Sequence, residues 1–279
     1  MLPTAIIVFR EILEAALIVS VVLAATKGVP GRGAWVGWGV AGGVAGACLV
    51  AAFAGAIAAW AAGMGQEVFN ACIMFLAVLM LGWHTIWMSR HGREMARELN
   101  AVGLAVSAGA RPLYALAIVV GIAVLREGSE VVLFLYGIAA GSPGQAVPMA
   151  IGGVLGVVAG VAVGWAMYAG LLRVAARHLF AVTTAMIVLV TAGMASQGVG
   201  YLVQADWLPA FGDTVWDTSA VLTDGSVLGK TLHALVGYEA QPAGIQLIAW
   251  GATLCAMGGL AWAFSRRRPA ARGALSAAE

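Results

Sequence analysis

Six charged side chains are set in apolar surroundings, in a pattern that could bind a metal ion. The spacing Arg-Glu-x-x-Glu occurs at residues 10–14 and again at residues 126–130, each time inside a mostly apolar stretch long enough to span a bilayer. A charged group at the centre of a bilayer costs about 2.5–3.5 kcal/mol on insertion scales, so such groups are rare and usually functional. The repeated pattern predicts a chain that binds or moves a cation.

Helical geometry places the charges of each copy on one face. Successive residues of an α-helix are rotated by about 100°, so Glu14 lies ~40° and Glu11 ~100° from Arg10. Such a face must point at a partner helix or at water, because acyl chains cannot solvate it. If the faces of the two copies meet, four carboxylates and two guanidinium groups carry a formal charge of −2, which a cation would neutralise.

Carboxylate oxygens select the class of metal ion. They suit Mg²⁺, Ca²⁺, Mn²⁺ and iron, whereas Cu⁺ prefers sulfur ligands. We predict four metal ligands, Glu11, Glu14, Glu127 and Glu130, and two charge-balancing residues, Arg10 and Arg126. The alternative is that arginine and glutamate only hold helices together, but this leaves the second glutamate of each copy without a structural reason.

Five further polar residues are candidates for an entry site or a path: Gln66, Glu67, Asn70, Gln197 and Asp217. The first three lie at the outer start of the predicted helix 67–89, where they could instead form an interfacial cap. Gln197 could line a polar path in the predicted helix 179–203. Asp217 belongs to an acidic loop that could concentrate cations or could be an ordinary solvated loop.

A single histidine, His84, lies deep in the apolar stretch 67–89, beside Trp83. For this pair we favour a hydrogen-bonded packing role. Metal ligation by His84 is the alternative that the sequence leaves open.

Composition indicates a multi-pass membrane protein without a sizeable soluble domain. The chain of 279 residues is 62% hydrophobic and 10% charged, whereas soluble domains average about 25% charged residues. Seven stretches are predicted as spans: 2–25, 34–61, 67–89, 112–140, 147–172, 179–203 and 244–265. The first has three charges and lacks a basic leader, so we expect a retained span rather than a cleaved signal peptide.

The distribution of Lys and Arg orients the predicted spans. Twelve of these residues fall on one side and only Lys230 on the other, which predicts an outer N-terminus and a cytoplasmic C-terminus. The segments between and after the spans are then a cytoplasmic linker at 90–111, an acidic extracytoplasmic loop at 204–243 and a cytoplasmic tail at 266–279. The basic run at the start of that tail is expected to anchor the topology, and no nucleic-acid partner is expected.

An internal repeat organises the chain. The second motif follows the first by 116 residues, and the same offset lays the second and third spans on the fifth and sixth. The units 1–89 and 112–203 each hold three spans, and this odd number makes them face opposite ways. We therefore predict an all-α membrane fold of two inverted three-helix repeats plus a seventh helix. Transporters built in this way bind their substrates near the bilayer midplane.

The doubled motif resembles the high-affinity iron permease family, the oxidase-dependent iron transporters also called the iron/lead transporter family. Relatives usually show Arg-Glu-Gly-Leu-Glu, and here Ile12-Leu13 and Gly128-Ser129 fill the variable places. Relatives also begin the third helix with an acidic cluster, which Glu67 matches and Asn70 does not. The bacterial ferrous-iron branch is similar in a further set: Gln197, Trp216-Asp217-Thr218-Ser219, Gly229, Leu232-His233-Ala234-Leu235-Val236-Gly237-Tyr238, Pro242 and Gln246.

The resemblance implies a permease of the cell inner (cytoplasmic) membrane that imports Fe³⁺ or Fe²⁺, with iron as substrate and no permanently bound cofactor. It also implies separate extracytoplasmic proteins that oxidise or deliver iron. Two alternatives keep the same fold: an importer of another divalent cation such as manganese or lead, and a membrane sensor that binds iron without moving it. We expect no enzyme, because the spans hold neither His-Glu-x-x-His nor Glu-x-x-His.

Overall fold

The computed structural model describes residues 1–61, 66–141, 144–169, 175–212 and 214–266, and within these ranges it contains helices and no strand. The helices are α1 (Leu2–Ala25), α2 (Arg32–Ala61), α3 (Gln66–Ser107), α4 (Tyr114–Gly141), α5 (Ala146–Tyr168), α6 (Ala175–Gln204), α7 (Val227–Val236) and α8 (Gly244–Arg266). A helix satisfies its backbone hydrogen bonds internally, which a hydrocarbon environment requires.

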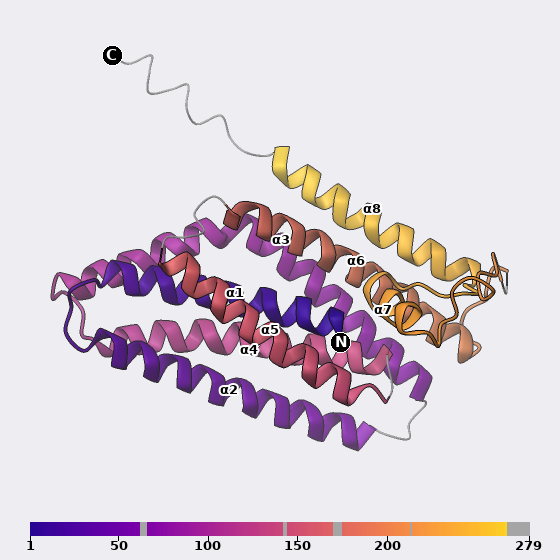
Figure 1. Ribbon diagram of the computed structural model, residues 1–279, viewed down its shortest axis with the longest axis horizontal. Helices are drawn as coiled ribbons and strands as arrows, with labels where there is room; N and C mark the ends of the chain where they lie inside the picture. The colour runs from indigo at the N-terminus through magenta and orange to yellow at the C-terminus, as the bar shows by residue number, and fades with distance from the viewer. Residues whose placement is uncertain (62–65, 142–143, 170–174, 213, 267–279) are drawn as a thin grey trace, which may run out of the picture.

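Helix α1, which carries the first motif, lies in the middle of the bundle and contacts α3, α4, α5 and α6 (Figure 1). It runs parallel to α5, from Met1 beside Gly152 at one end to Ala16 beside Gly164 at the other. Glycines at this spacing let the two backbones approach closely, as they do between membrane helices.

Helix α4, which carries the second motif, packs on α2 in the same parallel manner. Ala117 lies beside Gly39, and Gly128 lies beside Ala47 further along both helices. Each motif helix therefore packs on the glycine-rich middle helix of the other half of the chain.

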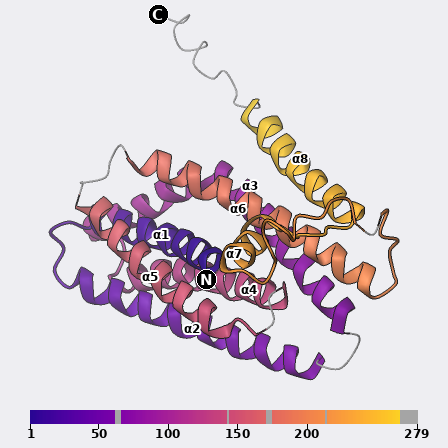
Figure 2. The same cartoon turned by 45° about the vertical axis from the view of Figure 1, so that its right-hand side comes forward.

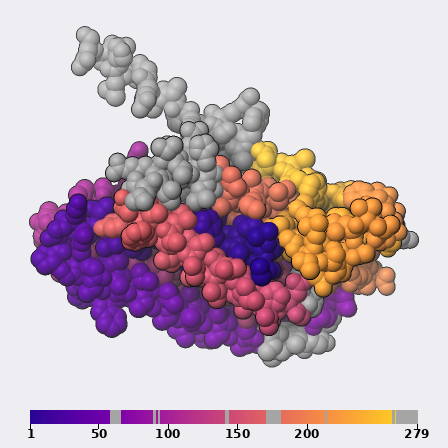
Figure 3. Space-filling model, in the orientation of Figure 1, coloured from indigo at the N-terminus to yellow at the C-terminus, as the bar shows by residue number. Residues whose placement is uncertain are grey.

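Two of the described connections between helices lie together at one end of the bundle, and a third lies at the other. The α1–α2 and α3–α4 turns lie together at one end, where Ser107 Oγ donates a hydrogen bond of 2.9 Å to Ala25 O. The segment that includes α7 covers the opposite end, beside the start of α8 (Figure 2). The first residues of α1 reach the surface between α5 and this segment (Figure 3).

Helix α3 is longer than the predicted span and includes most of the segment 90–111. Its extension buries Leu99 and Val106 against residues of α1 and α4. This packing and the mixed charges of Glu94, Arg97 and Glu98 favour a continuous helix. Only the first residue of the predicted tail, Arg266, is described, and the rest of the tail lies outside the described residues.

Four helical stretches are long and apolar enough to cross a membrane by length and composition: Arg32–Ile57, Gln66–Met88, Ala146–Tyr168 and Ala181–Gln204. Helices α1 and α4 have 24 and 28 residues, but each carries an arginine and two glutamates. In α8 the apolar part that the structure describes runs from Gly244 to Leu260. An all-helical bundle with four candidate membrane spans is thus confirmed, while seven spans and their orientation stay predictions.

Two glycines of α5 that are three residues apart offer a direct test of the contact between α5 and α1. A Cβ at Gly156 would lie 2.7 Å from Ala5 O and 2.9 Å from Phe9 N, whereas a Cβ at Gly153 would meet nothing within 4 Å. We expect Gly156→Ala to destabilise the protein by about 1–3 kcal/mol, the usual cost of overpacking. Gly153→Ala should not destabilise it, because alanine favours a helix. Thermal unfolding of both variants in detergent measures the difference, and equal melting temperatures would contradict this packing.

Candidate metal centre

A polar layer crosses the bundle between two hydrophobic clusters. One cluster includes Ile7, Met74, Leu81, Phe134 and Ile187, and the other includes Ile18, Val22, Leu99, Leu116 and Val120. The charged residues of both motifs lie between them on α1 and α4. Apolar packing on both sides lowers the polarity around the layer, so charges in it interact more strongly than they would in bulk water.

The two motifs meet in this polar layer. One donor atom from each of Glu11, His84, Glu127 and Glu130 lies within 4.8 Å of the others. Glu11, His84 and Glu127 are almost wholly buried, with exposed fractions of 0%, 4% and 2%. Since metal–ligand bonds to nitrogen and oxygen are about 2.0–2.2 Å long, donors at this spacing can hold one metal ion after small side-chain movements.

Arg10 neutralises the carboxylates of its own motif. Its Nη1 donates to Glu11 Oε1 at 2.8 Å, and its Nη2 lies 2.8 Å from Glu14 Oε1. All three residues are buried, and the Arg10 guanidinium pairs with both carboxylates. Such charge-assisted contacts are among the strongest polar interactions in proteins.

Arg126 holds the second motif more loosely. Its Nε lies 3.2 Å from Glu130 Oε1 and 3.9 Å from Glu127 Oε1, and its side chain is 32% exposed. The guanidinium also lies over the Trp87 ring, 4.2 Å from the centroid, in a cation–π contact. The two copies of one sequence pattern therefore differ in how much of their negative charge is compensated.

Several buried carboxylate oxygens have no hydrogen-bond partner among the described residues. They include both oxygens of Glu127 and the Oε2 atoms of Glu11 and Glu14. Buried polar atoms in native proteins are nearly always paired, and an uncompensated buried charge is strongly unfavourable. These free oxygens therefore mark the position where a cation would complete the centre.

His84 lies between the two motif helices. Its Nε2 is 3.5 Å from Glu14 Oε2 and 3.7 Å from Glu11 Oε2, while its Nδ1 contacts Glu130 Oε2. The sequence pattern favoured a packing role for this residue and for Trp83. The structure instead directs His84 at the carboxylates and leaves Trp83 73% exposed, so the ligand alternative is the better supported one for His84.

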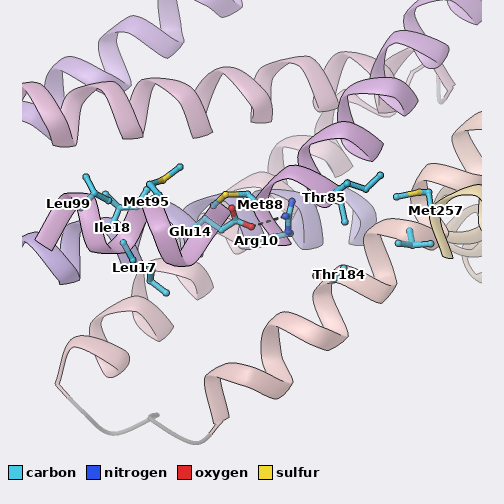
Figure 4. A pocket seen from close by; sticks show the side chains of 14 residues that line it. Arg10, Glu14, Leu17, Ile18, Thr85, Met88, Met95, Leu99, Thr184 and Met257 are labelled. Atoms are coloured by element: carbon cyan, nitrogen blue, oxygen red, sulfur yellow. Dashed lines mark ion pairs between the residues drawn. The ribbon is translucent and has the colours of Figure 1, made fainter. Parts of the chain in front are cut away.

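Two cavities border the centre. One of about 510 Å³ is lined by Arg10 and Glu14, by Thr85 and Thr184, and by apolar residues of α1, α3, α6 and α8 (Figure 4). It extends along α3 past Met95 to Leu99, toward the end of the bundle that holds the α1–α2 turn. The other, of about 440 Å³, is lined by residues that include His84, Arg126 and Glu130. An ion in the centre would lie between two spaces that could admit and release it.

The predicted entry residues on α3 lie far from this centre. Glu67 and His84 are 17 positions apart on one helix, which corresponds to about 25 Å along the axis. Gln66 Nε2 donates to Asn70 Oδ1 at 3.2 Å, so these two residues pair with each other at the helix start. Their placement at an entry remains a prediction.

The other two predicted path residues are hydrogen-bonded near α7. Gln197 is buried and its Nε2 donates to His233 O at 2.9 Å. Asp217 accepts hydrogen bonds from Ser219 Oγ at 2.6 Å and Ser219 N at 2.9 Å, which together lower the pKa of this exposed carboxyl. Asp217 also accepts a hydrogen bond from Gln241 Nε2, which lies in the segment just before α8. In this structure both residues hold the loop together rather than join the centre.

Comparison with known proteins gives a uniform result. Residues 1–266 match the profile of the iron permease FTR1 family. The chain is 31% identical over 249 residues to a protein of Shigella sonnei named ferrous iron permease EfeU, covering 88% of this chain and 89% of the relative. It is 33% identical over 241 residues to the ferrous iron permease EfeU of Yersinia pestis, covering 85% and 84%. No solved structure matches the chain.

Proposed function

The chain belongs to the iron permease FTR1 family, and on this basis we propose that it is a multi-pass membrane transporter that imports iron through the buried centre on α1, α3 and α4. A permease moves its substrate without converting it, so the proposed role is transport and not catalysis. Iron is the cargo of the centre and not a resident cofactor.

One observation carries the assignment of the site. Four donor groups from three helices, three of them buried and Glu130 half-buried, converge within 4.8 Å, and the oxygens of Glu127 among them have no hydrogen-bond partner in the described structure. The motif residues Glu11, Glu14, Glu127 and Glu130 would bind the ion, and Arg10 and Arg126 would limit the net negative charge. A divalent ion would neutralise the remaining formal charge of −2.

Ferrous iron is the proposed substrate. The relatives from Shigella sonnei and Yersinia pestis are both named ferrous iron permeases. A centre with two more carboxylates than arginines also suits a divalent ion, because binding leaves no net charge in a water-poor layer. Transport of Mn²⁺ or lead by the same centre is an alternative that the experiment below distinguishes.

The proposal includes seven spans, arranged as two inverted three-helix repeats and one further spanning helix. Helix α7 does not span the membrane in this arrangement. Support comes from the two parallel contacts, in which α1 packs on α5 just as α4 packs on α2. The positive residues favour a cytoplasmic position for the end with the α1–α2 turn, in the inner membrane of a bacterial cell. Proteins that oxidise or deliver iron outside the membrane would be separate chains.

Transport by the purified protein tests this proposal directly. The protein is inserted into liposomes that contain no other protein and enclose an iron-sensitive fluorophore, and Fe²⁺ is added outside with a reductant. We expect saturable uptake that exceeds leakage into empty liposomes. We also expect Fe²⁺ to be taken up in preference to Mn²⁺ and lead when the ions are added in competition.

Two results would contradict the proposal. Uptake equal to that of empty liposomes, by protein that binds Fe²⁺, would favour a sensor over a transporter. Faster uptake of Mn²⁺ or lead than of Fe²⁺ would keep the transporter and overturn the choice of ion. A parallel measurement with Fe³⁺ as its citrate complex tests the valence.

A further inference from the structure

We propose that His84 is a metal ligand and that its imidazole sets the preference of the centre for Fe²⁺ and similar transition-metal ions over Mg²⁺ and Ca²⁺. This inference rests on the proposed function, because it concerns which ions the same centre selects. Carboxylates alone would not make this selection, since they also suit the two hard ions.

The two nitrogens of His84 face different halves of the site. Nδ1 contacts Glu130 Oε2 on α4, and Nε2 points toward Glu11 and Glu14 on α1. A histidine that binds a metal through one nitrogen commonly donates its other N–H to a carboxylate, which fixes the tautomer and the ring orientation. Glu130 provides that carboxylate here, and the lone pair of Nε2 then faces the first motif.

The distances around Nε2 fit shared coordination better than hydrogen bonding. The separations of 3.5 Å to Glu14 Oε2 and 3.7 Å to Glu11 Oε2 exceed those of a good hydrogen bond. Two ligands that each lie ~2.1 Å from one tetrahedral metal ion are about 3.4 Å apart. Both Oε2 atoms lack a hydrogen-bond partner among the described residues, so an ion placed between them and Nε2 would engage all three atoms.

The repeat supports a specific role for this histidine. In the second half of the chain, α6 is the counterpart of α3, and its residues 181–204 contain no histidine and no acidic residue. The imidazole therefore breaks the symmetry that the two Arg-Glu-x-x-Glu motifs share. A group that only joined the two repeats would be expected in both of them, whereas a single metal ion needs one nitrogen ligand.

The test uses the full-length protein in detergent, loaded with Fe²⁺ alone under anaerobic conditions. X-ray absorption at the iron edge is expected to show the outer-shell scattering of one imidazole in the wild type. His84→Gln should lose this signal and keep the oxygen ligands. His91→Gln is the matched control, because His91 lies on the same helix but stacks on Trp87 and should leave the spectrum unchanged.

Competition measures the selectivity. We expect His84→Gln to bind Fe²⁺ at least about 10-fold more weakly, since loss of a ligand should cost no less than loss of an outer-shell partner, with little change for Mg²⁺. A wild-type iron spectrum without imidazole scattering would overturn the inference. This result does not depend on whether any variant folds. An unchanged preference for Fe²⁺ over Mg²⁺ in His84→Gln would overturn it too. If no Glu variant affects uptake, the proposed function itself fails, which is a separate result.

Discussion

Glu127→Gln is expected to lower the rate of iron uptake in liposomes by at least about 100-fold, because loss of a ligand should cost no less than the upper end of the 10–100-fold loss caused by removing an outer-shell partner. Glu127 is 2% exposed, and neither of its oxygens has a hydrogen-bond partner in the described structure. Glutamine keeps the shape of the side chain but lacks the charge and one of the oxygen ligands. The uptake assay with Fe²⁺ measures the loss.

The same substitution should make the metal-free protein more stable. A buried carboxylate without a partner opposes folding, and glutamine removes the charge without leaving a cavity. For a chain of this size each kcal/mol corresponds to roughly 2–4 °C in melting temperature. An inactive protein that melts at a higher temperature would show that Glu127 is kept for binding and not for stability.

Glu98→Gln is the matched control for this prediction. It makes the same chemical change at an exposed position of α3 that belongs to no predicted site, about 21 Å from His84 along the helix. We expect uptake and melting temperature to stay near the wild-type values. Equal losses in both variants would mean that the effect of Glu127→Gln is not specific to the buried centre, and normal uptake by Glu127→Gln would remove Glu127 from the site.

The six motif residues could be predicted from sequence because a charge inside an apolar stretch is costly and is seldom kept without a function. Their exact duplication also carried spatial information, since two similar units that each held three spans would be inverted relative to one another. The structure brings Glu11, Glu127 and Glu130 together as that argument requires. Sequence could not show that Arg10 is fully engaged while Arg126 is partly open, because this difference depends on packing by Trp87 and its neighbours.

The sequence did not place His84 beside the carboxylates, because a single residue has no pattern of its own. A usable signal lay in its neighbours: Met74, Ala77 and Leu81 precede it at spacings of three and four, and all are buried. His84 continues that buried stripe of α3, whereas Trp83 falls on the opposite, exposed side. Adjacent residues of a helix face different directions, so His84 and Trp83 should not be interpreted as a pair.

The sequence pattern also did not show where helix α3 ends. The charged segment after residue 89 was predicted as a linker, since a bilayer span needs only about 20 residues. Helix α3 nevertheless continues to Ser107, because Leu99 and Val106 are buried in the cluster shared with α1 and α4. Hydropathy measures the fit to a membrane, but the length of a helix also depends on tertiary contacts.

Arg10→Gln is expected to prevent accumulation of folded protein, while Arg126→Gln yields a folded protein with weaker iron uptake. Arg10 makes two contacts of 2.8 Å in a fully buried setting, and its loss would leave Glu11 and Glu14 without their cation. Breaking a buried ion pair in this way costs about 3–5 kcal/mol. Arg126 has longer contacts and a partly exposed side chain, so its replacement should destabilise the protein much less.

The yield of monodisperse protein from membranes, followed by thermal unfolding, compares the two arginine variants. A double variant then separates charge balance from the remaining effects of the substitution. Arg10→Gln leaves a buried carboxylate without its cation, so adding Glu14→Gln should restore part of the folded yield. The double variant would still lack one of the proposed ligands, so it should import little iron. Equal yields of the Arg10 and Arg126 variants, or no rescue by Glu14→Gln, would mean that the buried pairs of the first motif do not control folding.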